Sequence, residues 1–305
     1  MANLNGQNFR ILKLNPTTGK FEVVGMATNC TVNLNTNTSD QSTKDDVSLA
    51  AKPGINSKNW SVNVDSLSVS DVGAILTAMK ENTPFTLVWD EVSTSDNQTP
   101  VASTASARKG TAYLNDATFT FDSKTFASKQ LQFTGSGPLE HLSETPTAET
   151  ISAGSYTKGE TVRLFLGSDN TTTPSSVIAF ARTLSLHVSV QLESSATKDT
   201  EGDWDIQQPT GISYDISTSA LMRSGETITS AVGGQTVADL ESIYEASLPV
   251  KWLIANTSGA NHRTKGSVII SGSAIMASMT LNAQNRQVAS YNASLNGWGP
   301  YTVGA

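Results

Sequence analysis

Alternation of apolar and polar residues is the strongest pattern in this sequence, and it occurs in two separate pairs of segments. Residues 30–35 and 60–65 alternate in the first pair, and residues 184–191 and 212–217 alternate in the second. A period of two residues predicts strands with one buried face and one polar face. We therefore expect two long, half-buried strands in each half of the chain.

The connections within these strand pairs are long and polar, and they are predicted to span residues 36–59 and 194–211. Connections of that length in a compact domain are usually functional or disordered. Val47, Leu49 and Ile55 are apolar residues inside the first connection, where they would be unusual if the segment stayed in water. We expect both connections to become ordered in an assembly.

A short amphipathic helix is predicted after each strand pair. The first places Val72, Ile75, Leu76 and Met79 on one face behind Ser70 or Asp71 as the cap, and the second places Val237, Leu240 and Tyr244 on one face, with Thr236 and Asp239 spaced as a capping box. Pro84 and Pro249 follow the helices and end them.

More strands are predicted after the helices. The mostly apolar residues 85–89 and 250–254 suit strands covered on both faces, and further strands are expected at 113–121, 130–133, 267–276 and 288–295. These elements predict a mainly β fold, in which each half is a β-sandwich or open barrel with one flanking α-helix.

The two halves also resemble each other in sequence. In one order, residues 9–12 match 162–165, 26–34 match 180–188, 60–64 match 212–216, 109–110 match 265–266, and 133–139 match 295–301, the last pair sharing Gly-x-Gly-Pro. A copy of about 150 residues is too long for a solenoid repeat. We expect a tandem duplication: a first domain over 1–145, a linker over 146–160, and a second domain over 161–305.

Composition and charge exclude several classes of protein. The 305 residues are 37% hydrophobic and 15% charged, which allows ordinary cores under a lightly charged surface. Twenty basic and 27 acidic residues give a net charge of −7, the wrong sign for gripping phosphate. One cysteine, Cys30, permits no internal disulfide. We expect no membrane-spanning segment and no secretion signal, because no long apolar run is present.

Candidate chemistry is sparse. His141, His187 and His262 occur singly, Cys30 falls among buried strand positions, and no nucleophile has an evident base beside it. The run over 199–205 alternates oxygen-bearing side chains that could hold calcium, but it lacks the EF-hand order. We expect no enzyme, no cofactor and no metal site. Trp60, Trp89 and Trp252 are predicted core residues, while Trp204 and Trp298 are left open.

The order of strand, strand pair, flanking helix and closing strand with Gly-x-Gly-Pro resembles the tail tube proteins of long-tailed bacteriophages. The resemblance covers nearly the whole chain twice, and it is one of pattern, without a diagnostic short motif. It implies rings of six domains that stack into a hollow tube carrying double-stranded DNA from the capsid to the host. Two domains per chain imply that three chains form one pseudo-hexameric ring.

The same resemblance implies a location and partners. The protein would be assembled in the host cytoplasm and lie in the virion, in contact with copies of itself and with tape-measure, tail-tip and tail-terminator proteins, and not with a membrane. The inner tube of a contractile injection machine fits the sequence equally well.

On this hypothesis the polar strand faces line the channel, and the connections contact the next ring. The lumen-facing residues are Asn29, Thr31, Asn33, Asn35, Ser61, Asn63, Asp65, Thr183, Ser185, His187, Ser189, Gln191, Ser213, Asp215 and Ser217. The inter-ring residues are Lys44, Asp45, Val47, Leu49, Ile55, Lys198, Asp199 and Trp204. A wall with almost no Lys or Arg would let DNA slide, because DNA carries a charge about every 1.7 Å.

Two alternatives remain. The polar faces could simply meet solvent. The chain could instead be a secreted or surface adhesin, or a carbohydrate-binding protein, built from two β-sandwiches, which would also be rich in Ser, Thr and Asn.

Overall fold

The computed structural model describes most of the chain. The described residues are 6–15, 18–25, 27–46, 50–67, 71–93, 95–96, 98–101, 107–142, 145–147, 156–197, 202–222, 234–259 and 262–304. They form a mainly β, antiparallel structure with two α-helices, α1 (Val72–Lys80) and α2 (Val237–Ala246). The predicted mainly β fold with a helix in each half is confirmed.

The strands of the first half, up to residue 145, are β1 (Phe9–Leu14), β2 (Phe21–Val23), β3 (Ala27–Asp40), β4 (Pro53–Leu67), β5 (Phe85–Glu91), β6 (Arg108–Asp122) and β7 (Ser128–His141). The strands of the second half are β8 (Val162–Leu166), β9 (Ser176–Val177), β10 (Ala181–Ser194), β11 (Gln207–Leu221), β12 (Val250–Ser258), β13 (Thr264–Asn282) and β14 (Ser290–Val303). Short 3-10 turns cover Gly6–Asn8 and Gly159–Thr161.

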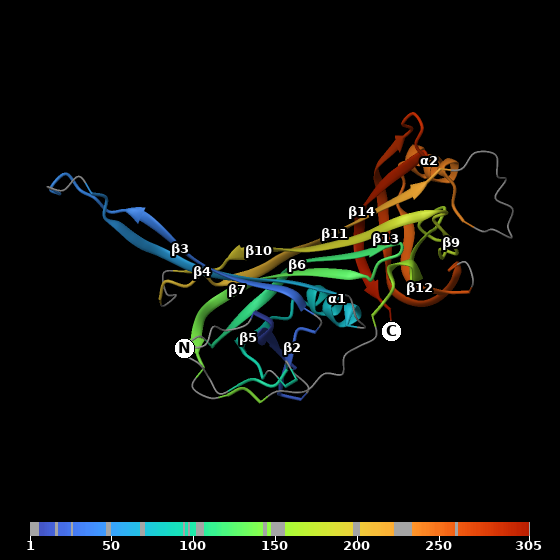
Figure 1. The fold of residues 1–305 in the computed structure, drawn as a ribbon. Coiled ribbons are helices and arrows are strands. Elements are labelled where there is room, and N and C mark those ends of the chain that lie inside the picture. The colour runs from blue at the N-terminus through green and yellow to red at the C-terminus, as the bar shows by residue number, and fades with distance from the viewer. Residues whose placement is uncertain are drawn as a thin grey trace.

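One hydrogen-bonded path joins the two halves. The strands follow the order β3-β4-β7-β6-β10-β11-β14-β13, each antiparallel to the next, and β6 pairs with β10 across the boundary between the halves. Shorter strands continue from β6 through β5 to β1 and β2, and from β13 through β12 to β8 and β9. In Figure 1 the β3–β4 hairpin extends away from the body, and β12 to β14 lie with α2 at the opposite end.

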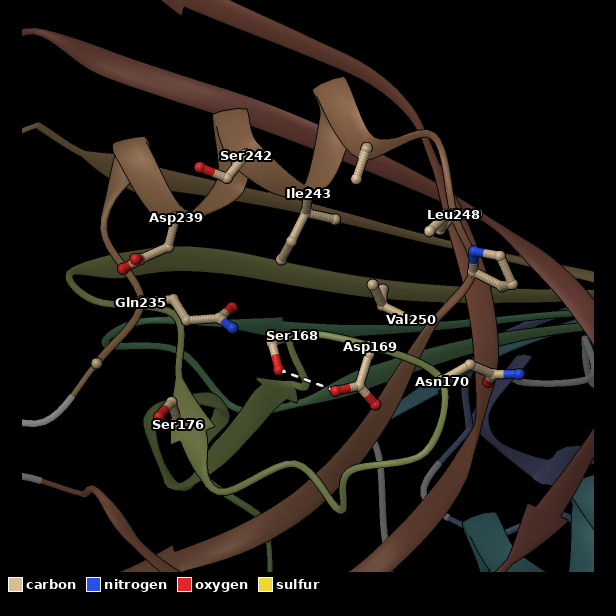
Figure 2. A pocket seen from close by; sticks show the side chains of 13 residues that line it. Ser168, Asp169, Asn170, Ser176, Gln235, Asp239, Ser242, Ile243, Leu248 and Val250 are labelled. Carbon is tan, nitrogen blue, oxygen red and sulfur yellow. Dashed lines mark hydrogen bonds between the residues drawn. The ribbon is translucent and has the colours of Figure 1, made fainter.

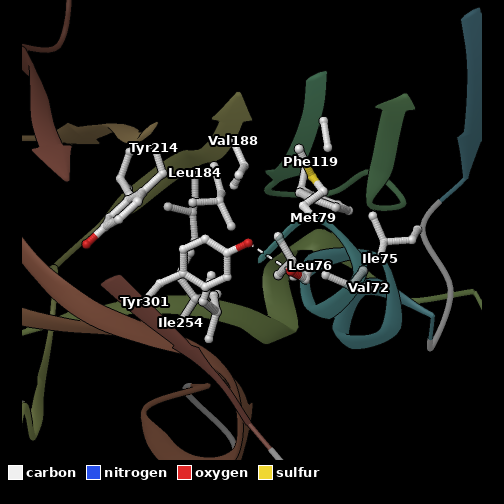
Figure 3. Packing of buried hydrophobic residues seen from close by; sticks show 14 of the residues in the cluster. Val72, Ile75, Leu76, Met79, Phe119, Leu184, Val188, Tyr214, Ile254 and Tyr301 are labelled. Carbon is white, nitrogen blue, oxygen red and sulfur yellow. Dashed lines mark hydrogen bonds between the residues drawn. The ribbon is translucent and has the colours of Figure 1, made fainter. Parts of the chain in front are cut away.

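The core lies on the apolar face of this path. The buried cluster combines residues from both halves, including Trp60, Phe119, Leu186 and Tyr301, so the halves share one core. Helix α1 is enclosed by it: it contacts β13 and β14, and the Tyr301 hydroxyl donates a hydrogen bond to the Leu76 carbonyl oxygen at 2.8 Å. Figure 3 shows Tyr301 reaching α1 beside Leu184, Val188 and Ile254.

The two long hairpins have the same internal geometry. β3 and β4 change register between Ala27 and Asn29 and again between Asn37 and Thr38. β10 and β11 do so between Ala181 and Thr183 and between Gln191 and Leu192, each 154 positions later. Each change of register marks a β-bulge or irregularity, which alters the local course of a strand pair. The two hairpins therefore share their irregularities and their length.

The closing strand pairs match in the same way at an offset of 162 residues. β6 and β7 change register after Lys109 and after Leu114, and β13 and β14 change register after Ser271 and after Met276. Below, residues are called position-matched when they hold the same place relative to these irregularities, 154 residues apart in the hairpins and 162 apart in the closing pairs.

Position matching corrects two of the sequence alignments. Trp60 is matched by Tyr214, and not by Ile212, because the β3–β4 and β10–β11 registers fix the offset at 154. Gly110 is matched by Gly272, and not by Gly266. The cross-strand partners show this, since Gly110 faces Leu87 and Gly272 faces Trp252. The alignments of 26–34 with 180–188 and of 133–139 with 295–301 agree with the registers.

The long polar connections were predicted with the wrong extent. Strands β3 and β4 remain paired as far as Asp40 and Pro53, and β10 and β11 as far as Ser194 and Gln207. Most of the predicted connections are therefore hairpin. The alternation of apolar residues stops there because neither face of the hairpin end is covered, while the backbone pairing continues.

The second helix buries a different face from the one predicted. Leu240 and Ile243 are its buried residues, while Tyr244 is exposed. The predicted capping box at Thr236 and Asp239 is confirmed. In α1, Asp71 occupies the cap position without a side-chain capping bond, and Ser70 lies outside the described residues.

Candidate channel-lining and assembly surface

The predicted lumen-facing residues of each hairpin share one face. The register places Asn29, Thr31 and Asn33 directly opposite Asp65, Asn63 and Ser61, and places Ser185, His187 and Ser189 opposite Ser217, Asp215 and Ser213. Asn35, Thr183 and Gln191 continue the same faces opposite Asn59, Ser219 and Gly211. The polar positions therefore form two continuous surfaces, directed away from the buried Trp60 and Tyr214 side of the hairpins.

The polar face continues across strands that the sequence analysis left out. Cross-strand pairing connects it through Gln130, Gln132 and Thr134 of β7, Asp116, Thr118 and Thr120 of β6, Asn292, Ser294 and Asn296 of β14, and Ser278 and Thr280 of β13. These strands also alternate in sequence, which could have indicated them. All eight strands of the long path thus present one polar face.

A charged cluster crosses the boundary between the halves on this face. His187 of β10 lies between two carboxylates, with Nδ1 2.7 Å from Asp215 Oδ1 and Nε2 2.7 Å from Asp116 Oδ2. Burial opposes the charged imidazole, but the hydrogen bonds with Asp116 and Asp215 outweigh it and raise the pKa of His187 above its usual value. A protonated imidazole donates from both nitrogens and can satisfy both carboxylates.

The polar face is neutral to acidic. Among the face positions in the described part of β3, β4, β6, β7, β10, β11, β13 and β14, the carboxylates are Asp65, Asp116, Asp122 and Asp215, and no Lys or Arg stands at these positions. Lys129 of β7 belongs to the opposite face, where it is buried and lies 2.6 Å from an Asp71 carboxylate oxygen.

The predicted inter-ring residues are placed only in part. Lys44 and Asp45 are exposed in the turn of the first hairpin, and Ile55 is exposed on β4 near its end. Val47, Leu49, Lys198 and Asp199 lie outside the described residues. Trp204 is half-buried against its own chain, with Lys58 Nζ 5.9 Å from its ring centroid. The contact observed for Trp204 is thus within one chain.

The end of the second hairpin rests on the first half. Lys58 of β4 donates its backbone N–H to the Asp203 carbonyl at 2.5 Å, and Asp205 donates to the Lys58 carbonyl at 3.0 Å. Gly137 of β7 donates to the Asp205 carbonyl at 2.8 Å. The hairpin end is therefore held by backbone hydrogen bonds to two neighbouring strands.

A pocket of about 560 Å³ lies beside α2, shown in Figure 2. Its carboxylates are already engaged. Thr171 and Thr172 donate hydrogen bonds to Asp169 and hold its pKa well below the usual range, while Asp239 is bound to Thr236 in the capping box. Neither carboxylate is poised to take up a proton, so the pocket offers no acid or base for a reaction.

The remaining candidate residues are structural. Trp60, Trp89 and Trp252 are buried as predicted, whereas Trp298 is exposed. Cys30 is half-buried, and burial raises the pKa of its thiol, which disfavours the reactive thiolate. The described residues contain no group of three or more His, Cys, Asp or Glu side chains able to hold a metal ion. Among them, no helix has the length and apolar character needed to cross a bilayer.

Comparison with known proteins gives fold similarities of limited extent. No protein-family model matches the sequence, and no curated protein matches it. Three solved structures each cover 48% of the chain. They are the tail of an empty gene transfer agent particle (12% identity, 98% of that chain, TM-score 0.37), the virion of a native gene transfer agent (12%, 98%, 0.35) and the SPP1 tail tube (15%, 78%, 0.35). At these scores the function must be argued from the geometry of the chain itself.

Proposed function

We propose that this protein is the structural subunit of a phage-type tail tube. Three chains would close side by side into a ring, and the rings would stack into a hollow tube. The observation that carries the proposal is the eight-stranded path with one polar, neutral to acidic face and an unpaired strand at each end. Joining such ends around a ring removes every exposed edge, as in a closed barrel.

We further infer that the chain is a duplication of one domain, with copies at 1–145 and 161–305 joined by 146–160. The shared irregularities of the two hairpins and of the two closing strand pairs support it. Two such domains occupy neighbouring places in one sheet, so a ring of three chains has six similar places. A contact that closes by rotation gives a ring, and its repetition along an axis gives a tube.

The polar face is proposed to line the channel. Double-stranded DNA would pass along it without sequence recognition, because a wall lacking Lys and Arg offers no fixed partner to phosphate. The partners are then copies of the chain, together with tape-measure, tail-tip and tail-terminator proteins, and the location is the virion after assembly in the host cytoplasm. Lys44, Asp45, Ile55 and the other turn residues of the hairpins remain candidates for contact between rings.

Electron microscopy of the purified chain tests the proposal. We expect tubes or threefold rings with a central hole. Single chains that stay monodisperse at high concentration and during tail assembly would contradict it and favour the adhesin. The channel assignment has its own test: Asn33→Lys with Ser185→Lys should leave tubes intact and slow DNA delivery, and normal infectivity of that variant would remove the assignment.

A further inference from the structure

The chain contains one joint between its halves, and this joint supplies a template for a second. Strand β10 pairs with β6 so that Leu186 faces Phe119 and His187 faces Thr118. On the apolar side the joint is closed completely, since Leu186 is 1% exposed and Phe119 is 0% exposed. Both strands also have their other neighbours, β11 and β7.

The position-matched strands have the same neighbours except for this joint. β3 is the match of β10 and pairs with β4 alone, and the end of β13 after Ala274 is the match of the end of β6 and pairs with β14 alone. In the described part of the chain, one edge of β3 and one edge of β13 therefore carry unpaired backbone groups.

Side chains at these two edges are exposed where their matches are buried. Leu34 on β3 is 63% exposed, while its match, Val188, is 0% exposed. Leu281 on β13 is 49% exposed, while its match, Phe119, is 0% exposed. Strand β13 also ends at Asn282, whereas β6 continues for two further residues that pair with β10.

We propose that β3 of one chain pairs antiparallel with the free edge of β13 of a second copy of this chain. The register follows from the joint within the chain: Val32 faces Leu281, Asn33 faces Thr280, Leu34 faces Met279, and Thr31 faces Asn282. This inference rests on the proposed function, because it names the contact by which the copies would join into a ring.

The register brings like faces together, which the offsets alone do not guarantee. Val32 and Leu34 meet Leu281 and Met279 on the apolar side, and Asn33 meets Thr280 on the polar side. A slip by one residue would direct every side chain of β3 to the other face. The seam between copies is neutral at its centre, since Asn33, Ser61 and Ser278 stand where the internal joint has His187, Asp215 and Asp116.

A second contact of the internal joint also has an open match. The end of the β10–β11 hairpin rests on Lys58 of β4 and on β7 beside Ser136. The position-matched residues are Ile212 and Trp298, and both are exposed. In the proposed seam they receive the turn of the β3–β4 hairpin of the second copy, so one neighbour covers both the open edge and this apolar pair.

Disulfide trapping tests the register. In a Cys30→Ala chain, Thr31→Cys is combined with Asn282→Cys, because facing residues of antiparallel strands have Cα atoms about 4.5–5.5 Å apart, within disulfide range. The matched control is Ser185→Cys with Thr120→Cys, the equivalent pair inside the chain. A slipped pair, Thr31→Cys with Thr280→Cys, is the second control, because diagonal neighbours lie about 7–8 Å apart.

We expect covalent oligomers from the first pair, an internal disulfide without change of mass from the matched control, and no cross-link from the slipped pair. Rings or tubes in which the slipped pair cross-links, or in which neither pair does, would overturn the register and leave the proposed function standing. Chains that remain single and uncross-linked while the matched control oxidises would overturn both.

A charge at the seam gives an independent measurement. Leu34→Asp should abolish association by at least tenfold in the concentration needed for assembly, because the carboxylate would be buried against Met279. The isolated chain should unfold at the same urea concentration as the parent, since Leu34 is exposed there. Assembly at the parental concentration would contradict the seam.

Discussion

Helices α1 and α2 hold corresponding places in the two halves, yet one is enclosed and the other is open on one side. α1 buries Val72, Ile75, Leu76 and Met79, whereas α2 buries only Leu240 and Ile243. The difference comes from the neighbour: β13 and β14 of the second half cover α1, while Tyr244 of α2 is left exposed. In one chain, the same position is core at an internal joint and surface at a free end.

The helices are also attached by different chemistry. At the start of α1, the carboxylate of Asp71 accepts two hydrogen bonds from the buried Lys129 ammonium, at 2.6 and 2.7 Å. The match of Lys129 is Tyr291, whose buried hydroxyl has no hydrogen-bond partner, and α2 begins with the Thr236 capping box instead. The enclosed helix thus depends on a buried ion pair, and the open helix on a surface cap.

Breaking these two attachments should give the largest difference between the halves. Asp71→Ala leaves the Lys129 ammonium buried without a partner, which costs about 3–5 kcal/mol of unfolding free energy. Thr236→Ala removes one cap, which costs about 1 kcal/mol. Urea unfolding of both variants measures the contrast.

A double variant separates charge burial from lost packing. Asp71→Ala with Lys129→Met removes both partners, so most of the loss should be recovered, because a buried pair replaced by apolar groups is often neutral. Equal losses for Asp71→Ala and Thr236→Ala, or no recovery in the double variant, would show that the ion pair does not hold α1.

The aromatic residue at the centre of each half gives a second contrast. Trp60 stands over Gly110 and Gly135, and Tyr214 stands over Gly272 and Gly297. A methyl group at Gly135 would run into the Trp60 indole, so Gly135→Ala should destabilise by about 1–3 kcal/mol. Gly297→Ala should cost less, because the phenol ring of Tyr214 is smaller and can shift.

Thermal unfolding of both glycine variants measures this contrast, and Trp60→Tyr in the Gly135→Ala chain provides the control. The smaller ring should restore part of the melting temperature, since it copies the arrangement at Tyr214. A melting temperature that falls further would show that the contact between Gly135 and Trp60 does not limit packing there.

How far the sequence predicts this molecule depends on which interactions fix each part. The alternation around Val62 and Leu186 predicts the hairpin faces correctly, because burial on one face imposes a period of two. The matching of Trp60 with Tyr214 was missed, since β-bulges and strand registers depend on backbone pairing that leaves no side-chain pattern. The tie between His187, Asp116 and Asp215 was missed because it joins three strands that are remote in sequence.

The internal joint and the proposed seam differ in charge at their centres, and pH sharpens that difference with the smallest expected effect. His187 has a pKa raised above its usual value in the folded chain, so its pairing with Asp116 and Asp215 stabilises fully below the unfolded pKa of about 6.5 and is lost as pH rises through the folded pKa. The side chain is about one-third exposed, so we expect about 1 kcal/mol after solvent screening. His187→Asn, which copies Asn33, should therefore be less stable than the parent at about pH 5.5 and nearly equal to it at about pH 9. Asn33→His is the matched control: with Ser61 opposite and no carboxylate like Asp116 beside it in the chain, it should add no such dependence. Urea titrations across this range measure both variants, and a loss in His187→Asn that is the same at both ends of the range would mean that the imidazole acts by shape alone and that the internal joint needs no charge.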